Sequence, residues 1–86
     1  MRIRVARSGR KHKIGNARIL MAMRNAGVPM VVPETDQLLY VGEDDRGVEL
    51  EVIAVPDDRN PGGLTVIHAM PTSFRDDNRE EEADER

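Results

Sequence analysis

The chain has 86 residues, a formal net charge of −3, no cysteine, and Tyr40 and Phe74 as its only aromatic residues. This length suits one domain with a modest core, because so short a chain buries only about 60% of its unfolded surface. The lack of cysteine excludes a disulfide framework, and no apolar run approaches the roughly 18 residues that a membrane-spanning helix needs. We therefore expect a small cytoplasmic domain with an aliphatic core.

The net charge hides an uneven distribution along the chain. Residues 1–24 hold eight Lys or Arg and no acid, residues 25–74 hold two Arg and nine acids, and residues 75–86 hold three Arg and seven acids. A basic segment of this density favours contact with a polyanion such as RNA, since binding depends on the local field. The alternative is that the basic segment pairs with the acidic remainder of the chain.

The first predicted elements are a strand and a helix. Residues 1–6 alternate Arg with Ile and Val, the period of a short edge strand or of a basic arm. A loop over residues 7–15 leads to a helix over residues 16–26, which consists mostly of good helix formers. Gly27 and Pro29 end this helix, because glycine is typical of a helix C-terminus and proline cannot continue the turn.

Four predicted strands follow the helix and are separated by turn residues. They cover residues 28–32, 38–42, 48–55 and 64–70. Because the connections are short, we expect neighbouring strands to form an antiparallel meander. The predicted fold class is α+β, with an N-terminal helical part packed on a three- to four-stranded antiparallel sheet.

The predicted domain covers residues 1–75. Residues 76–86 differ from it in composition, because Ala83 is their only apolar residue. We expect this acidic tail to be disordered or a frayed helix that adds nothing to the core. Its charge would also allow it to fold back over the basic segment.

The last two predicted strands carry residues of chemical interest. In the strand over residues 48–55, period-2 alternation turns Glu51 away from the helix. In the last strand, the same alternation puts His68 on one face with Leu64 and Val66. A histidine on an apolar face is often a structural hydrogen-bonding residue, so a catalytic and a structural role both remain open.

Residues suited to RNA cleavage without a metal are spread along the chain. Cleavage through the RNA's own 2′-hydroxyl needs a base, an acid and cations around the phosphate. The catalytic candidates are His12, His68 and Glu51, because histidine serves as acid or base near neutral pH and a buried glutamate can act as base. We expect no metal and no cofactor, since no ligand spacing indicates one. The RNA-binding candidates are Arg10, Lys11, Lys13, Arg46 and Arg75.

Four segments carry a resemblance to a known family. They read KHKIG (11–15), LYVGEDDRG (39–47), VELEVIAV (48–55) and VIHAMPTSFR (66–75). In their order and spacing they resemble the small toxins related to BrnT, within the broad RelE/ParE-like toxin group. The resemblance implies a compact α/β toxin, a metal-independent ribonuclease that blocks translation, and a cognate antitoxin, often with a ribbon-helix-helix DNA-binding domain, that covers the basic site.

The match to this family differs from segment to segment. Lys11 and His12 match its basic box, whereas the turn at 46–47 reads Arg-Gly where the family more often has Gly-Arg. The family also more often ends in Ser-Ala-Arg/Lys and a basic, Tyr-containing helix, where this chain has His68, Arg75 and an acidic tail. The hypothesis is a ribonuclease toxin of a type II toxin–antitoxin pair, and the alternative is a non-catalytic binding module of the same fold. An exposed edge strand also makes a homodimer possible.

Overall fold

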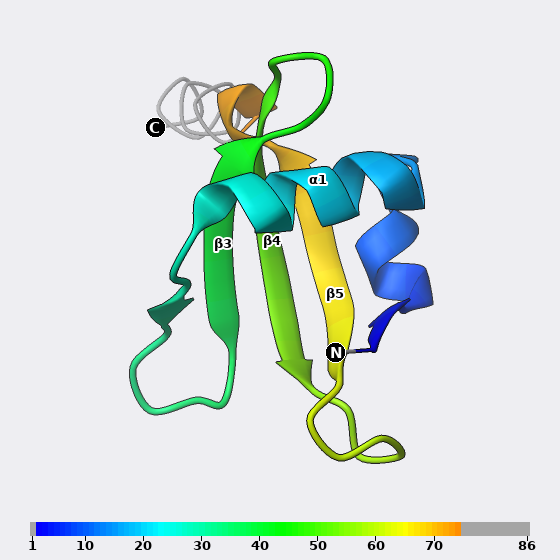
Figure 1. Cartoon of the computed structure of the whole chain (residues 1–86), viewed down its shortest axis with the longest axis vertical. Coiled ribbons are helices and arrows are strands. Elements are labelled where there is room, and N and C mark those ends of the chain that lie inside the picture. Colours follow the sequence, from blue (N-terminus) through cyan, green and yellow to red (C-terminus); the bar gives the residue numbers. More distant parts are fainter. Residues whose placement is uncertain (1, 75–86) are drawn as a thin grey trace, which may run out of the picture.

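The computed structural model of the chain describes residues 2–74 and contains a five-stranded sheet with one α-helix on one face (Figure 1). The predicted α+β class is therefore confirmed. The predictions for Arg75 and for residues 76–86 concern positions outside this described part. In chain order the elements are β1 (Ile3–Val5), the 3₁₀ helix η1 (Arg7–Arg10), α1 (Asn16–Ala26), β2 (Met30–Val31), β3 (Leu38–Glu43), β4 (Glu49–Pro56) and β5 (Leu64–Pro71).

Helix α1 begins and ends where the sequence predicts. Gly15 is its N-cap, and Gly27, with a φ of 73°, ends it in the left-handed region that favours glycine. The helix buries Ile19, Ala22 and Met23 on the side that contacts β3 and β4. It crosses the upper half of the strands, so the lower half of the same face has no helix over it (Figure 1).

The close approach of α1 to the sheet depends on Gly42 in β3. A Cβ at this position would overlap the carbonyl oxygen of Ala22 and lie 2.7 Å from the backbone nitrogen of Ala26. These are backbone atoms, which cannot move aside as the end of a flexible side chain can. Asn25 also ties the helix to this strand, because its Nδ2 donates a hydrogen bond to the carbonyl oxygen of Glu43 (2.7 Å).

The sheet is mixed, with the strand order β1-β5-β4-β3-β2. Strands β2 to β5 are successive antiparallel neighbours, as predicted. Strand β1 instead pairs in parallel with β5, with Ile3 opposite Leu64 and Val5 opposite Val66. The expected three- to four-stranded, wholly antiparallel meander is wrong in this respect. Because Ile3 and Val5 pack into the core, the N-terminal segment is an edge strand rather than a free basic arm.

An irregularity in the β4–β5 pairing changes which face the residues of β5 occupy. Strand β4 pairs Ile53 with His68 but Ala54 with Val66, so Ile67 is an extra residue in β5. The extra residue inverts the alternation, and His68 therefore lies on the opposite face from Val66. The prediction that these two residues share a face is wrong for this reason.

Two buried aspartates hold the turns at opposite ends of β4. Asp44 Oδ1 accepts hydrogen bonds from the backbone N–H groups of Arg46 and Val48 (2.8 and 3.0 Å), and its Oδ2 accepts one from Nε of Arg18 in α1 (2.6 Å). Burial opposes ionisation of Asp44, but the Arg18 side chain and these backbone donors outweigh it and lower the pKa of the carboxyl. The pKa of Asp57 is lowered chiefly by the backbone N–H two residues later.

Candidate functional site

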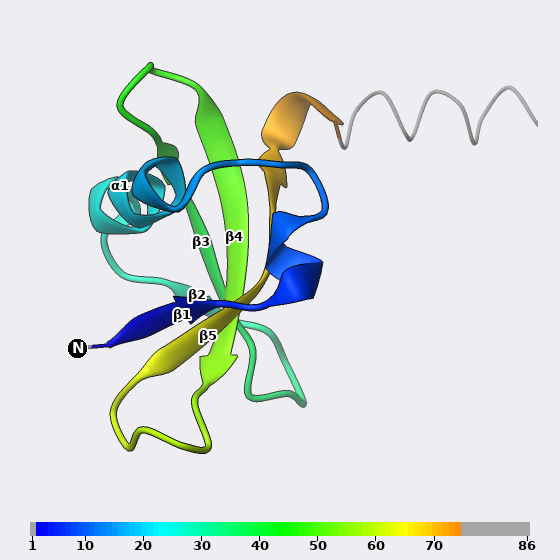
Figure 2. The ribbon, with the colours of Figure 1, turned by 90° about the vertical axis from the view of Figure 1, so that its right-hand side faces the viewer.

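The three residues predicted to be catalytic lie together on the face of the sheet opposite α1. The irregularity in β5 turns His68 toward Glu51 of β4, and His68 Nε2 lies 3.0 Å from Glu51 Oε2. The ring of His12, from the loop between η1 and α1, meets the His68 ring edge to face with the centroids 6.2 Å apart. This loop passes over to the side of the sheet away from α1 (Figure 2).

Burial and hydrogen bonding make Glu51 and His68 an oriented pair. Glu51 is only 3% exposed, whereas the His68 side chain is 30% exposed and open to a substrate. When Glu51 is ionised, Nε2 of His68 donates to it and Nδ1 is the nitrogen that can accept a proton. A carboxylate that fixes the tautomer and orientation of an imidazole is the arrangement that positions a general base.

The loop that carries His12 is held at two neighbouring positions. Ile14 is buried in the core cluster. Lys13 has a φ of 57°, in the left-handed region, and its N–H donates to the carbonyl oxygen of Arg10 (2.9 Å). A non-glycine residue in this region costs on the order of 1–3 kcal/mol, so the surrounding contacts must maintain the loop in this shape. The side chain of His12 is thereby kept over His68.

Phe74 belongs to the site, although the sequence analysis did not select it. Its ring meets the ring of His12 at an interplanar angle of 76°, with the centroids 5.8 Å apart, and the residue is 43% exposed. It lies in a helical turn over residues 72–74 that directly follows β5 (Figure 2). An exposed aromatic ring beside cations is a surface on which an unpaired base can stack. The chain has only one Phe and one Tyr and no Trp, and this scarcity of aromatic residues could have marked Phe74 as a candidate.

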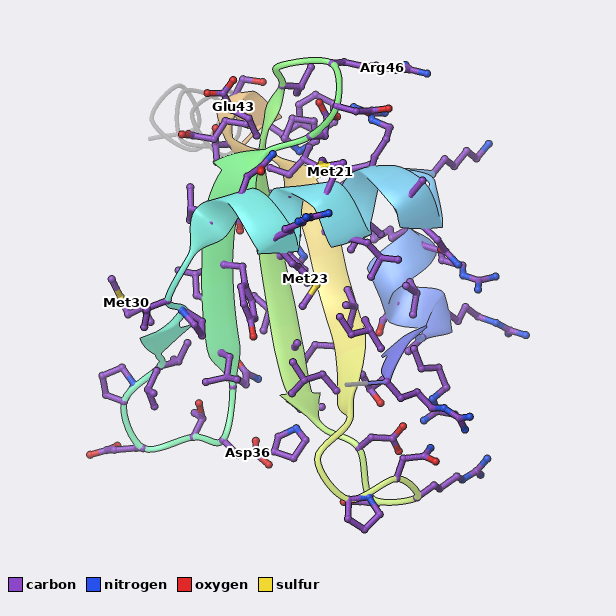
Figure 3. The ribbon with its side chains drawn as sticks, in the orientation of Figure 1. Met21, Met23, Met30, Asp36, Glu43 and Arg46 are labelled. Atoms are coloured by element: carbon purple, nitrogen blue, oxygen red, sulfur yellow. The ribbon has the colours of Figure 1, made fainter. Side chains whose placement is uncertain are left out.

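The predicted RNA-binding residues do not all reach the histidines. Arg10, Lys11 and Lys13 are exposed on η1 and on the loop that holds His12. Arg46 is exposed in the β3–β4 turn, which leans toward the α1 side, and the structure does not bring it to the histidines (Figures 2 and 3). Arg75 lies outside the described residues. Three of the five predicted cations therefore lie on the segment that carries His12.

Part of the N-terminal positive charge pairs with acids within the chain. Arg18 forms an ion pair with Asp44 (2.6 Å), and Arg4 approaches Asp57 more loosely (3.8 Å). The alternative interpretation of the basic segment therefore holds for these two cations. None of the cations next to His12 has an ion-pair partner among residues 2–74, which leaves them available to a phosphate.

The β3 side of the site is acidic. Glu49 lies directly opposite Glu43 in the β3–β4 pairing, and both share the face of Glu51. Oε1 of Glu49 accepts a hydrogen bond from Oγ1 of Thr72 (2.9 Å), which orients the carboxylate. Because like charges repel, a phosphate group would approach the histidines from the η1 side and not across β3.

Residues 2–74 show few other features that indicate a functional class. In residues 2–74 no group of three or more His, Cys, Asp or Glu side chains is arranged to hold a metal ion. No helix in that range is long and apolar enough to cross a membrane. The chain matches no family model, no curated protein and no solved structure. The function must therefore be inferred from the arrangement of the side chains.

Proposed function

We propose that the chain is a metal-independent ribonuclease that acts as the toxin of a type II toxin–antitoxin pair. The observation that carries the proposal is the convergence of Glu51, His68 and His12 on one face of the sheet, beside exposed cations. These residues come from three separate parts of the sequence. The resemblance of four sequence segments to BrnT-like toxins supports the same function.

In the proposed reaction the RNA's own 2′-hydroxyl is the nucleophile. His68, oriented by Glu51, accepts the hydroxyl proton at Nδ1 while the 2′-oxygen forms a bond to the adjacent phosphorus. The bond from phosphorus to the 5′-oxygen breaks, and His12 donates a proton to that leaving oxygen. The products are a 2′,3′-cyclic phosphate and a 5′-hydroxyl, and the neighbouring cations stabilise the negative charge of the transition state.

The geometry supports this division of roles. The centroids of the His12 and His68 rings are 6.2 Å apart, so nitrogens of both rings can reach one phosphodiester group. Of the two histidines, only His68 has a carboxylate partner among residues 2–74 that can hold it as a base. A positioned acid or base contributes typically about 10²–10⁴-fold to a reaction rate, so each histidine is expected to matter on its own.

The partner, the compartment and the oligomeric state belong to the same proposal. The partner is an antitoxin encoded beside this chain, with a ribbon-helix-helix DNA-binding domain, and the pair acts in the cytoplasm. A homodimer would use the edge of the sheet at β2. Pro29 and Pro33 flank that strand and leave little backbone for pairing, so we expect any such dimer to be weak.

A non-catalytic binding module of the same fold is the second candidate function. The acidic side of the site favours it, because Glu43 and Glu49 lie on the face that RNA would contact and repel phosphate groups. This candidate predicts that the chain binds a partner without cleaving RNA. The two candidates therefore differ in a single measurable activity.

An RNA-cleavage assay with the purified full-length chain tests the proposal. The substrate is a fluorescent single-stranded RNA in EDTA, and DNA of the same sequence is the control that lacks the 2′-hydroxyl. We expect RNA cleavage with a cyclic phosphate end, slowed about 10²–10⁴-fold in His12→Ala and in His68→Ala. Circular dichroism is used to check that both variants fold.

Three results would contradict the ribonuclease proposal. They are cleavage of the DNA control, full activity in both histidine variants, and wild-type activity that is seen only when EDTA is left out of the assay. If the wild-type chain binds RNA or a partner but leaves RNA intact, the non-catalytic module is the better description.

A further inference from the structure

A second surface lies on the face of the sheet that carries α1, away from the histidines. Below the helix is a groove of about 450 Å³, lined by Leu20 and Met23 of α1, Ile3 of β1 and Tyr40 of β3. Figure 3 shows Met23 directly below the helix, over the middle of the strands. The groove is therefore mostly apolar.

The dimensions of the sheet leave room for a second helix at this groove. Strands β4 and β5 have eight residues each, and a strand rises about 3.3 Å per residue, so they are roughly 26 Å long. Packed helices lie only about 8–10 Å apart, and α1 crosses the upper half of the strands alone (Figure 1). A second helix beside α1 would complete the layer.

Exposed apolar side chains also lie along the segment from α1 to β2. Val28, Met30 and Val31 are 94%, 66% and 61% exposed, and Leu20 is 43% exposed. Val31 pairs with Leu38 and shares the face that carries α1, whereas Met30, labelled in Figure 3, pairs with Leu39 and belongs to the opposite face. Four of the seven large apolar residues exposed in residues 2–74 thus lie in α1 or just after it. Leu20 and Val31 add exposed apolar surface on the face of the groove, and exposed apolar surface of this kind marks an interaction site.

The charge beside the groove indicates what the partner carries. Helix α1 contains Arg18 and Arg24 and no acid. Arg18 is paired with Asp44, whereas Arg24 lines the groove, is exposed, and forms no ion pair with any residue from 2 to 74. A carboxylate on the partner would meet Arg24 and gain an ion pair in a partly apolar setting.

Two other occupants fit the groove less well. A second copy of the chain placed symmetrically would bring two Arg24 side chains toward each other. Residues 76–86 contain Ala83 as their only apolar residue, so they offer nothing to fill an apolar groove. The described chain also ends at Phe74, on the opposite face of the sheet beside His12.

We propose that this groove is the docking site for an amphipathic helix of another protein. The helix presents apolar side chains at i, i+3 or i+4, and i+7 to Leu20, Met23 and Tyr40, and it presents a carboxylate to Arg24. This interaction does not depend on the chemistry at the histidines, because the two surfaces lie on opposite faces of the sheet.

Selection from a random 16-residue peptide library on the immobilised full-length chain tests the proposal. We expect the enriched peptides to be acidic and amphipathic with helical spacing. Their affinity is then measured by fluorescence anisotropy against Leu20→Gln, with Val41→Gln as the matched control. Val41 is equally exposed (44% against 43%) but lies on the other face of the sheet. We expect at least a tenfold loss for Leu20→Gln and less than a twofold change for the control.

A second variant keeps the test independent of any effect of Leu20→Gln on folding. Arg24→Glu, at an exposed position, is expected to weaken the acidic peptides and to regain affinity when the peptide carboxylate facing it is replaced by Lys. The proposal is overturned if no acidic amphipathic peptide is enriched, or if Leu20→Gln and Val41→Gln bind the peptides equally well. It is also overturned if sedimentation shows a dimer that Leu20→Gln dissociates, or if a synthetic peptide of residues 76–86 competes for the groove.

Discussion

The contact between Glu51 and His68 predicts a measurable coupling between the two side chains. Glu51→Gln keeps the shape of the side chain and removes its charge, and His68→Ala removes the ring. Their atoms lie 3.0 Å apart, with Glu51 almost fully buried and His68 30% exposed. A hydrogen bond to a charged group contributes about 1.5–3 kcal/mol, and partial exposure of His68 favours the lower end. We therefore expect a coupling energy of about 1–2 kcal/mol.

Urea unfolding of the wild type, the two single variants and the double variant at pH 7 measures this coupling as a double-mutant cycle. Glu43→Gln combined with His68→Ala is the matched control. Glu43 is an exposed glutamate on the same face of the sheet, and within residues 2–74 it forms no hydrogen bond or ion pair with the His68 ring. For this control pair we expect a coupling energy below about 0.5 kcal/mol.

The same variants separate an oriented base from two independent groups in the RNA-cleavage assay. If Glu51 acts through His68, Glu51→Gln slows the reaction in the wild-type background but causes no further loss in the His68→Ala background. Rate losses that multiply in the double variant, or a coupling energy no larger than that of the Glu43 control, would refute the conclusion that the two side chains work as a unit.

Three other predictions test the fold and the site. Gly42→Ala should lower the free energy of unfolding by about 1–3 kcal/mol, whereas Gly15→Ser, at an N-cap with nothing within 4 Å of the new Cβ, should change it by less than about 0.5 kcal/mol in thermal unfolding. Because folding lowers the pKa of Asp44, the stabilising effect of this carboxylate is fully present above the ordinary aspartate pKa of 3.8 and is lost as the pH falls through the folded-state pKa. The Asp44→Asn variant should therefore be less stable than the wild type at pH 7 and should lose less stability than the wild type between about pH 5 and 2. If the urea midpoint of the variant depends on pH as that of the wild type does, the pairing of Asp44 with Arg18 is contradicted. Phe74→Ala should weaken the binding of single-stranded RNA about 5–150-fold in fluorescence anisotropy, with the same salt dependence as the wild type. Phe74→Trp should restore the affinity. A changed salt dependence would instead indicate that phosphate contacts are lost.

Local sequence chemistry was enough to predict the elements, but not all of their pairings. The helix could be located because its helix-forming residues follow the loop over residues 7–15 and stop at Gly27, which ends the helix as expected. The parallel position of β1 could not be predicted in the same way. Its alternation of Arg with Ile and Val describes any edge strand, and the choice of β5 as its neighbour depends on how the chain returns after α1.

For the candidate site, too, the sequence indicates which residues have suitable chemistry but not where the fold places them. His12, His68 and Glu51 could be selected for their chemistry, but nothing near them in sequence indicates that they meet. The decisive feature is Ile67, the extra residue in β5. Val66 and Ile67 are both apolar, so the sequence does not show where the alternation is interrupted. Arg46 failed to join the site because the turn that carries it leans toward α1 (Figure 2).

The extra residue in β5 also explains how this strand supplies apolar side chains to the core on one face of the sheet and His68 to the other face. Leu64 and Val66 precede it and belong to the apolar core layer under α1. Without it, unbroken alternation would put His68 in that same layer, where a titratable ring is costly to bury without a partner. With it, His68 meets Glu51 on the open face, and the apolar face remains free of ionisable groups at this point. Because the groove and the histidines are then separated by the sheet, a substitution such as Leu20→Gln does not alter the candidate catalytic residues, and the docking and cleavage proposals can fail independently of each other.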